Sequence, residues 1–188
     1  YEHMFFKANK DIPSQEAFLA RVAELGISFN GTTSGERVNY YVTLSNQKVK
    51  EGLEFMNSAI RYPLFLEEEM ENEQPVVDEE FLRAESNPTF FLFQDLNHAL
   101  WKGNYSRKNV IGDHDIIKSA TAEKMKIIQD KYYNPNNSLI TVAGDVNHKV
   151  MFDMIESIYG DWEPADFNVF EKYPIPEIEP LTEDEFFI

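Results

Sequence analysis

The chain has 188 residues, of which 43% are hydrophobic and 27% charged, a balance typical of folded globular proteins. Its formal net charge of −16 disfavours nucleic-acid binding, and indicates either a surface kept soluble by acidic residues or a negative field that attracts cationic substrates. No apolar stretch approaches the roughly 20 residues of a membrane span, and without cysteine there is neither a disulfide framework nor a thiolate metal site.

The first predicted elements are a helix and a β-hairpin. Ser14 is a suitable N-cap for a helix that ends at Leu25, because Gly26 follows it. The stretch I-S-F-N-G-T-T-S-G-E indicates a strand leading into a polar turn. R-V-N-Y-Y-V-T-L then alternates as a half-buried strand does, so we expect the two strands to pair.

Three helices are predicted next. The first spans residues 46–61, with Pro63 after it, and has four apolar residues at helical spacing: Val49, Leu53, Met56 and Ile60. The second is an acidic helix over 66–84, which Pro75 is expected to kink or break. The third covers 89–101, after the joint at Asn87-Pro88.

The C-terminal part alternates helix, strand and helix. A helix is predicted for 121–132, a buried strand for S-L-I-T-V-A-G-D at 138–145, and a last helix for 149–159. Because helices outnumber strands and the hairpin strands are adjacent in sequence, we expect an α+β fold with an antiparallel sheet.

After Trp162 the composition changes to an acidic, proline-rich stretch, E-K-Y-P-I-P-E-I-E-P-L-T-E-D-E, which is typical of a linker. The final F-F-I resembles the start of a strand whose partner is absent. We therefore expect a domain over 1–163, followed over 164–188 by a linker and the start of a further domain, in a chain cut at both ends.

Four residues are candidates for chemistry. Glu2 and His3 are adjacent, and Glu73 and Glu80 are seven residues apart, which places both carboxylates on one face of a helix. An imidazole and carboxylates can hold a metal ion together. The alternative interpretations are an exposed chain terminus for Glu2-His3 and a solvated helix face for Glu73 and Glu80.

The order of several motifs resembles the pitrilysin/insulinase zinc metallopeptidases, which carry the inverted zinc motif H-x-x-E-H. They are E-H-M-F-F-K, N-G-T-T-S-G-E-R-V-N-Y-Y, the E-x6-E of the acidic helix, and Y-Y-N-P-N-N-S-L-I-T-V-A-G-D-V. The resemblance extends from residue 1 to about residue 160. It implies a metallohydrolase fold like that of the mitochondrial processing peptidase, truncated at its N-terminus, with the chain starting inside the motif.

The resemblance also implies roles. Glu2 would be the general base, His3 and Glu80 zinc ligands, and Glu73 a supporting carboxylate. The motif's first histidine would lie two residues before Tyr1, so this chain alone is expected to hold zinc weakly and to be inactive.

The strand at 28–32 would lie at the edge of the sheet, where Phe29, Asn30 and Gly31 would bind substrate through backbone pairing. The other three histidines are expected to be surface residues and not ligands: His98, His114 in a loop, and His148 at a helix start.

The function expected from the resemblance is a zinc-dependent endopeptidase acting on peptides or small unfolded proteins. The alternative is a non-catalytic relative that serves as scaffold or partner subunit. Expected partners are peptide substrates and a second homologous half, fused or separate. The compartment stays open, with the bacterial periplasm or cell envelope favoured over the cytoplasm.

Overall fold

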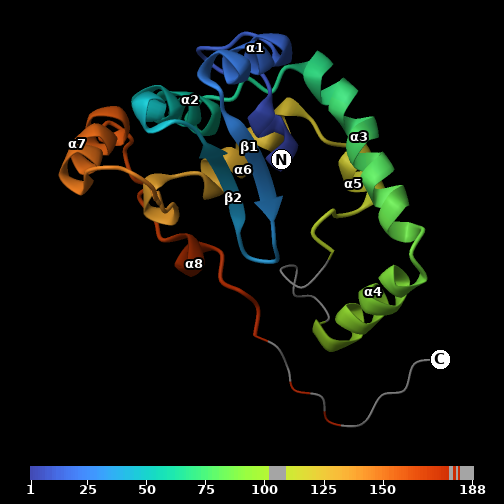
Figure 1. The fold of residues 1–188 in the computed structure, drawn as a ribbon. Helices are drawn as coiled ribbons and strands as arrows, with labels where there is room; N and C mark the ends of the chain where they lie inside the picture. The colour runs from blue at the N-terminus through green and yellow to red at the C-terminus, as the bar shows by residue number, and fades with distance from the viewer. Residues whose placement is uncertain (102–108, 178–179, 181, 183–188) are drawn as a thin grey trace.

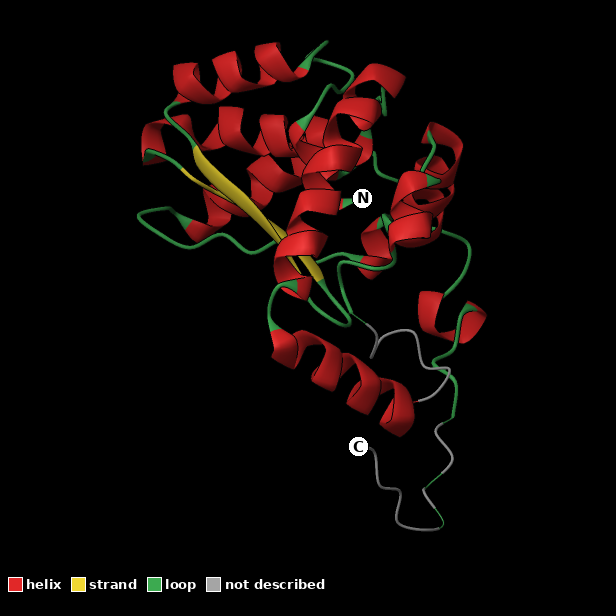
Figure 2. Ribbon diagram, turned by 90° about the vertical axis from the view of Figure 1, so that its right-hand side faces the viewer, coloured by secondary structure: helices red, strands yellow, loops and turns green. Residues whose placement is uncertain are grey.

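A β-hairpin with helices around it forms the centre of the protein (Figures 1 and 2). The structure is a computed structural model, and it describes residues 1–101, 109–177, 180 and 182. The elements are η1 (Glu2–Phe6), α1 (Gln15–Leu25), β1 (Ser28–Thr33), β2 (Val38–Thr43), η2 (Asn46–Lys48), α2 (Val49–Arg61), α3 (Glu67–Glu85), α4 (Pro88–Trp101), α5 (His114–Lys118), α6 (Ala122–Tyr132), η4 (Pro135–Asn137), α7 (His148–Tyr159) and α8 (Val169–Lys172).

The predicted α1 and hairpin are confirmed. The Ser14 hydroxyl accepts a hydrogen bond from the N–H of Ala17 at 3.2 Å, and Gly26 ends the helix in a left-handed conformation with φ of 65°. β1 and β2 pair antiparallel, in a register that runs from Ser28 opposite Thr43 to Thr33 opposite Val38. The α+β prediction is therefore correct, with a two-stranded sheet in the described part of the chain.

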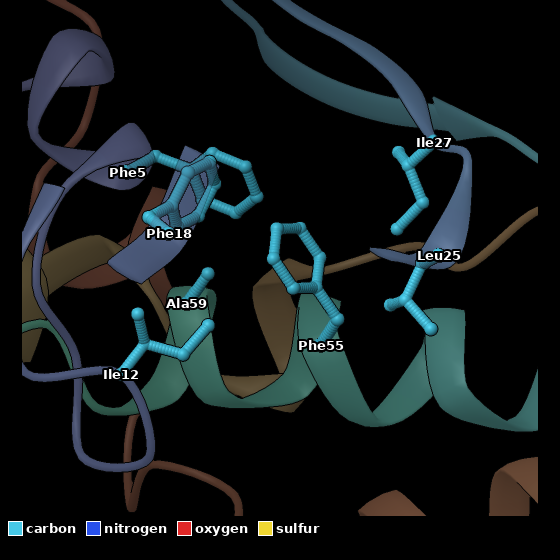
Figure 3. Packing of buried hydrophobic residues seen from close by; sticks show 7 residues of the cluster. All are labelled: Phe5, Ile12, Phe18, Leu25, Ile27, Phe55 and Ala59. Atoms are coloured by element: carbon cyan, nitrogen blue, oxygen red, sulfur yellow. The ribbon is translucent and has the colours of Figure 1, made fainter. Parts of the chain in front are cut away.

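The main core lies between the hairpin, α1, α2 and η1. Its buried members are Phe5, Ile12, Phe18, Leu25, Ile27, Phe55 and Ala59 (Figure 3). Phe5 stacks on Tyr40 of β2 with ring centroids 4.2 Å apart, and Phe18 packs edge-on against Phe29 of β1 at 5.6 Å. These aromatic contacts attach the N-terminal segment to one face of the sheet.

Helix α2 uses two apolar faces. Phe55 and Ala59 enter the main core. The four residues selected by periodicity, Val49, Leu53, Met56 and Ile60, are only half-buried, and Met56 and Ile60 also pack against the main core. A helix that is apolar on two sides needs cover on both.

The expected break at Pro75 does not occur, because α3 runs unbroken from Glu67 to Glu85 with the proline inside it. Contacts from residues that precede Pro75 hold this part of the helix in place. Glu69 accepts hydrogen bonds from the backbone N–H groups of Ala8 at 2.9 Å and Gln15 at 2.7 Å. Gln74 donates to the carbonyl of Ala120 at 3.0 Å. Tertiary contacts thus offset the loss of one helical hydrogen bond.

The strand predicted for residues 138–145 is wrong: no described residue there belongs to a strand. Leu139 is 90% exposed, so the segment is not buried either. The β-branched composition favours a strand, but a strand forms only where a neighbouring strand supplies hydrogen bonds.

After α7, the chain forms short helix α8 within the predicted linker, and the F-F-I at 186–188 lies outside the described residues. Among the helices of the described ranges, none is long and apolar enough to cross a membrane.

His114, expected in a loop, is the first residue of α5. Its side chain connects α5 to α3. Its Nδ1 lies 2.5 Å from Asp78 Oδ1, and its Nε2 lies 3.5 Å from Glu85 Oε2. The ring also packs on Phe81 with centroids 4.0 Å apart. The hydrogen bond to Asp78, with a further one to Glu85, raises the pKa of His114 above its usual range.

We therefore expect His114 to make stability depend on pH. A group whose pKa is raised on folding contributes stability that is complete below its unfolded pKa, about 6.5, and lost as pH rises through its folded pKa. Urea unfolding between pH 5 and 9 should show a stability difference between wild type and His114→Gln that shrinks with rising pH. A pH-independent difference would contradict the prediction.

Candidate active site

His3 lies between the two carboxylates that the sequence singles out. His3 Nδ1 is 2.7 Å from Glu73 Oε1, and His3 Nε2 is 3.6 Å from Glu80 Oε2. η1 carries the histidine, and unbroken α3 presents both glutamates on one face. The structure thus brings His3, Glu73 and Glu80 together as the spacing predicts.

The hydrogen bond to Glu73 orients the imidazole. Nδ1–H donates to the Glu73 carboxylate, which leaves the other ring nitrogen, Nε2, directed towards Glu80. Two ligands about 2.0–2.2 Å from a tetrahedral zinc ion lie roughly 3.3–3.6 Å apart, so this pair fits two corners of such a site. Within residues 1–101, 109–177, 180 and 182, no group of three or more His, Cys, Asp or Glu side chains could hold a metal. The described residues therefore provide an incomplete ligand set.

Lys7 is a further partner of Glu73, on the side away from His3, and the sequence analysis did not identify it. Its side chain is only 5% exposed, and its ammonium forms an ion pair with Glu73 Oε2. Burial alone would raise the pKa of Glu73, but hydrogen bonds from Lys7 and His3 lower it. The sequence pattern that could have identified Lys7 is its place within the apolar run M-F-F-K-A. A lysine there is buried with its neighbours and needs a carboxylate as partner.

Glu2 points to β1. Thr33 Oγ1 donates a hydrogen bond to Glu2 Oε2. A Cβ placed on Gly31 would lie 2.8 Å from Glu2 Oε1, so glycine leaves room for this carboxylate. Thr33 is a second contact that the sequence analysis did not identify.

The three residues predicted to bind substrate have different surroundings. Gly31 lies beside Glu2, as described above. Asn30 turns its side chain to its own backbone, where Oδ1 accepts from the N–H of Gly31 at 2.9 Å. Phe29 packs against Phe6 with ring centroids 4.9 Å apart, so its side chain belongs to the core. Among the described residues β1 pairs with β2 alone, which leaves its outer edge open.

A cluster of three tyrosines lies next to Glu2. The hydroxyls of Tyr40 and Tyr133 are 2.8 Å apart, and the ring of Tyr1 packs on Tyr133 with centroids 4.5 Å apart. Burial, with a contribution from the charge of Glu2, raises the pKa of Tyr133 to about 12, so its hydroxyl stays protonated as a donor at neutral pH.

Two family models match the chain. The model described as Insulinase (Peptidase family M16) matches residues 1–114, and the one described as Peptidase M16 inactive domain matches residues 119–188.

Relatives and solved structures agree with these matches. An uncharacterized zinc protease of Rickettsia felis is 25% identical over 169 residues, which is 90% of this chain and 41% of that protein. A protease from Helicobacter pylori superposes with a TM-score of 0.80 at 24% identity, over 95% of this chain and 42% of that one. The first half of the periplasmic protease PqqL from Escherichia coli gives a TM-score of 0.75 at 20% identity, over 89% of this chain and 38% of that one.

The chain thus spans about two fifths of the length of these proteins. The first family model covers more than half of its residues and includes His3, Glu73 and Glu80. The chain belongs to the insulinase family of peptidases, family M16.

Proposed function

We propose that residues 1–188 are part of a zinc-dependent endopeptidase that hydrolyses peptides or small unfolded proteins. The observation that carries this proposal is the orientation of His3, whose Nδ1 is engaged by Glu73 while Nε2 is directed towards Glu80. A carboxylate that fixes one imidazole nitrogen and leaves the other for a metal is the usual arrangement around zinc-binding histidines.

Each residue has a proposed role. His3 and Glu80 bind zinc, and Glu73 orients His3. Zinc, when bound, lowers the pKa of a coordinated water towards about 7 and polarises the scissile carbonyl. Glu2 takes a proton from the attacking water and passes it to the leaving amine. The hydrogen bond from Thr33 holds Oε2 of Glu2 in place, so Oε1 is the oxygen that we assign to proton transfer.

The outer edge of β1 is the proposed substrate-binding edge. Its backbone can pair with an extended peptide without reading side chains, which suits broad specificity. Gly31 brings this edge next to Glu2. Because the half-buried Phe29 side chain packs against the core aromatic residues Phe6 and Phe18, we assign binding there to the backbone and not to the phenyl ring.

A non-catalytic scaffold or partner subunit is the second candidate function. It is favoured by the match of residues 119–188 to a model described as an inactive domain. The presence of Glu2, His3, Glu73 and Glu80 favours the enzyme, because a scaffold has no need of all four.

The remaining proposals concern context. We propose a second homologous half as partner, in line with the two-part PqqL of Escherichia coli, and a domain over 1–163 followed by a linker over 164–188. The periplasmic PqqL also supports a periplasmic or envelope location.

The first prediction concerns zinc affinity. Residues 1–188 should lose zinc on dialysis against a mild chelator, because two ligands seldom make a stable site. In the whole peptidase, Glu80→Gln should weaken zinc binding about 10-fold or more, whereas the neighbouring exposed Glu79→Gln should not. Zinc content by mass spectrometry is the measurement, and equal zinc in both variants would refute the assignment of Glu80.

The second prediction separates the base from the ligands. In the whole peptidase, Glu2→Gln should reduce kcat about 100- to 10,000-fold and keep its zinc, because an amide cannot accept the proton. The rate of cleavage of fluorescently labelled casein measures kcat, and Glu16→Gln, at an exposed position of α1, is the control. Cleavage by Glu2→Gln at the wild-type rate would exclude Glu2 as the base.

The third prediction concerns the ion pair between Lys7 and Glu73. Lys7→Met should lower the free energy of unfolding by about 3–5 kcal/mol, because it leaves the half-buried carboxylate of Glu73 without its cation. Adding Glu73→Gln should restore part of that loss. Urea unfolding in metal-free buffer tests both variants.

Lys50→Met is the matched control, since it breaks an exposed ion pair with Glu54 and should cost less than about 1 kcal/mol. If the stability losses of Lys7→Met and Glu73→Gln simply add in the double variant, the two residues are not coupled.

A further inference from the structure

A pocket lies between the C-terminal half of α3 and the first turns of α4, which meet at an angle across residues 86–87 (Figure 1). It has a volume of about 520 Å³. Its lining residues come from both helices and the joint between them: Glu80, Arg83, Ala84, Asn87, Thr89, Phe90 and Phe93. We call it the α3–α4 pocket.

One end of the pocket is the candidate metal ligand Glu80. Its carboxylate lies 3.6 Å from Nε2 of His3, so the pocket begins where zinc is proposed to bind. Arg83 lies three residues further along α3, which is about 4.5 Å along the helix axis. An extended peptide advances about 3.3 Å per residue. The pocket is therefore within reach of a substrate side chain that lies within about three residues of the scissile bond.

The wall formed by α4 is aromatic. Phe90 and Phe93 are three residues apart on this helix, so they share one of its faces. Phe90 is half-buried and packs edge-on against buried Phe81 with ring centroids 5.9 Å apart, which fixes its position. Phe93 is 59% exposed. Covering its ring with an apolar side chain would remove apolar surface from water, which favours binding.

The polar side chains at the joint between the helices bond to each other. Asn87 Oδ1 accepts hydrogen bonds from the Thr89 hydroxyl at 2.8 Å and from the Thr89 N–H at 3.1 Å. The Thr89 hydroxyl hydrogen is thus used within the wall itself. Once Glu80 is bound to zinc, Arg83 is the charged group that decides the electrostatics of the pocket.

Arg83 has a positive charge that is not neutralised by an ion pair. Glu80 is directed towards His3, and Glu85 towards His114. Within residues 1–101, 109–177, 180 and 182, no ion pair includes Arg83. A basic side chain of a substrate would be repelled there, whereas an aromatic ring can stack on the guanidinium plane.

We propose that the α3–α4 pocket binds a bulky apolar side chain of the peptide substrate, with aromatic side chains preferred, and excludes basic ones. This assignment rests on the proposed endopeptidase function, because it places the bound side chain next to the zinc site. Phe90 and Phe93 supply the apolar surface, and Arg83 discriminates against lysine and arginine. The net charge of −16 alone would suggest the opposite selectivity, since an acidic surface attracts cationic peptides.

Cleavage of a peptide series by the whole zinc-loaded peptidase tests the proposal. The peptides share one sequence and carry Phe, Ala or Lys in turn at each of the three positions on either side of the scissile bond. At one position kcat/KM should be about 10-fold or more higher for Phe than for Ala, and lower still for Lys. Equal kcat/KM for the three residues at every position would overturn the proposal and leave the endopeptidase function intact.

Two variants connect this preference to the pocket, both at exposed positions where the substitution should not prevent folding. Phe93→Ala should lower kcat/KM about 10-fold for the Phe peptide and leave the Ala peptide unchanged. Arg83→Gln should raise kcat/KM for the Lys peptide about 5-fold or more, because it removes the like charge. Leu92→Ala is the matched control, since Leu92 is 64% exposed on the same helix and does not line the pocket. A preference for Phe that survives Phe93→Ala unchanged would overturn the proposal.

Binding without turnover separates the pocket from catalysis. In the Glu2→Gln peptidase, a fluorescein-labelled Phe peptide should bind about 10-fold more tightly than the Ala peptide, as measured by fluorescence anisotropy. If the wild type cleaves no peptide but this selectivity holds and is lost on adding Phe93→Ala, the endopeptidase function fails and the pocket stands. Equal affinity for the Phe and Ala peptides would overturn the pocket, whatever the wild type cleaves.

Discussion

The carboxylate of Glu73 connects the N-terminal segment to α3, and the candidate site depends on it. One oxygen accepts from His3 and the other forms an ion pair with buried Lys7. Without Glu73 the lysine would be a buried cation with no partner, which is among the most costly defects a protein can contain. The same carboxylate sets the imidazole orientation, so the packing of η1 and the geometry of the site have one cause. Continuity of α3 through Pro75 then places Glu80 opposite the second ring nitrogen.

The charge around His3 agrees with a cation site. The imidazole lies between two carboxylates, and Glu2 precedes it in the chain. Lys7 neutralises one of these negative charges but lies on the far side of Glu73, bound to its other oxygen. The space between His3 and Glu80 therefore favours a positive ion, since a carboxylate attracts a cation. The overall charge of −16 could not have located this site, because most of the acidic side chains are on the surface.

The hairpin has two open edges in different environments. The edge of β1 lies beside Glu2 and Thr33, where a peptide bond can approach polar groups. The edge of β2 faces an apolar groove whose other side is an unpaired extended segment. A polar edge that is open on one side suits an extended segment that binds through backbone pairing.

The sequence by itself determined the features whose signals are local. Ser14 and Gly26 mark the ends of α1, alternation marks β2, and a spacing of seven brings Glu73 and Glu80 to one face of a helix. Only the tertiary structure decided what depends on distant neighbours. Residues 138–145 have strand composition but no adjacent strand, and Pro75 stays within α3 because contacts from Ala8, Gln15 and Ala120 hold the helix. Lys7 and Thr33 gained their roles from residues 66 and 31 positions away in the chain, and no local pattern encodes such contacts.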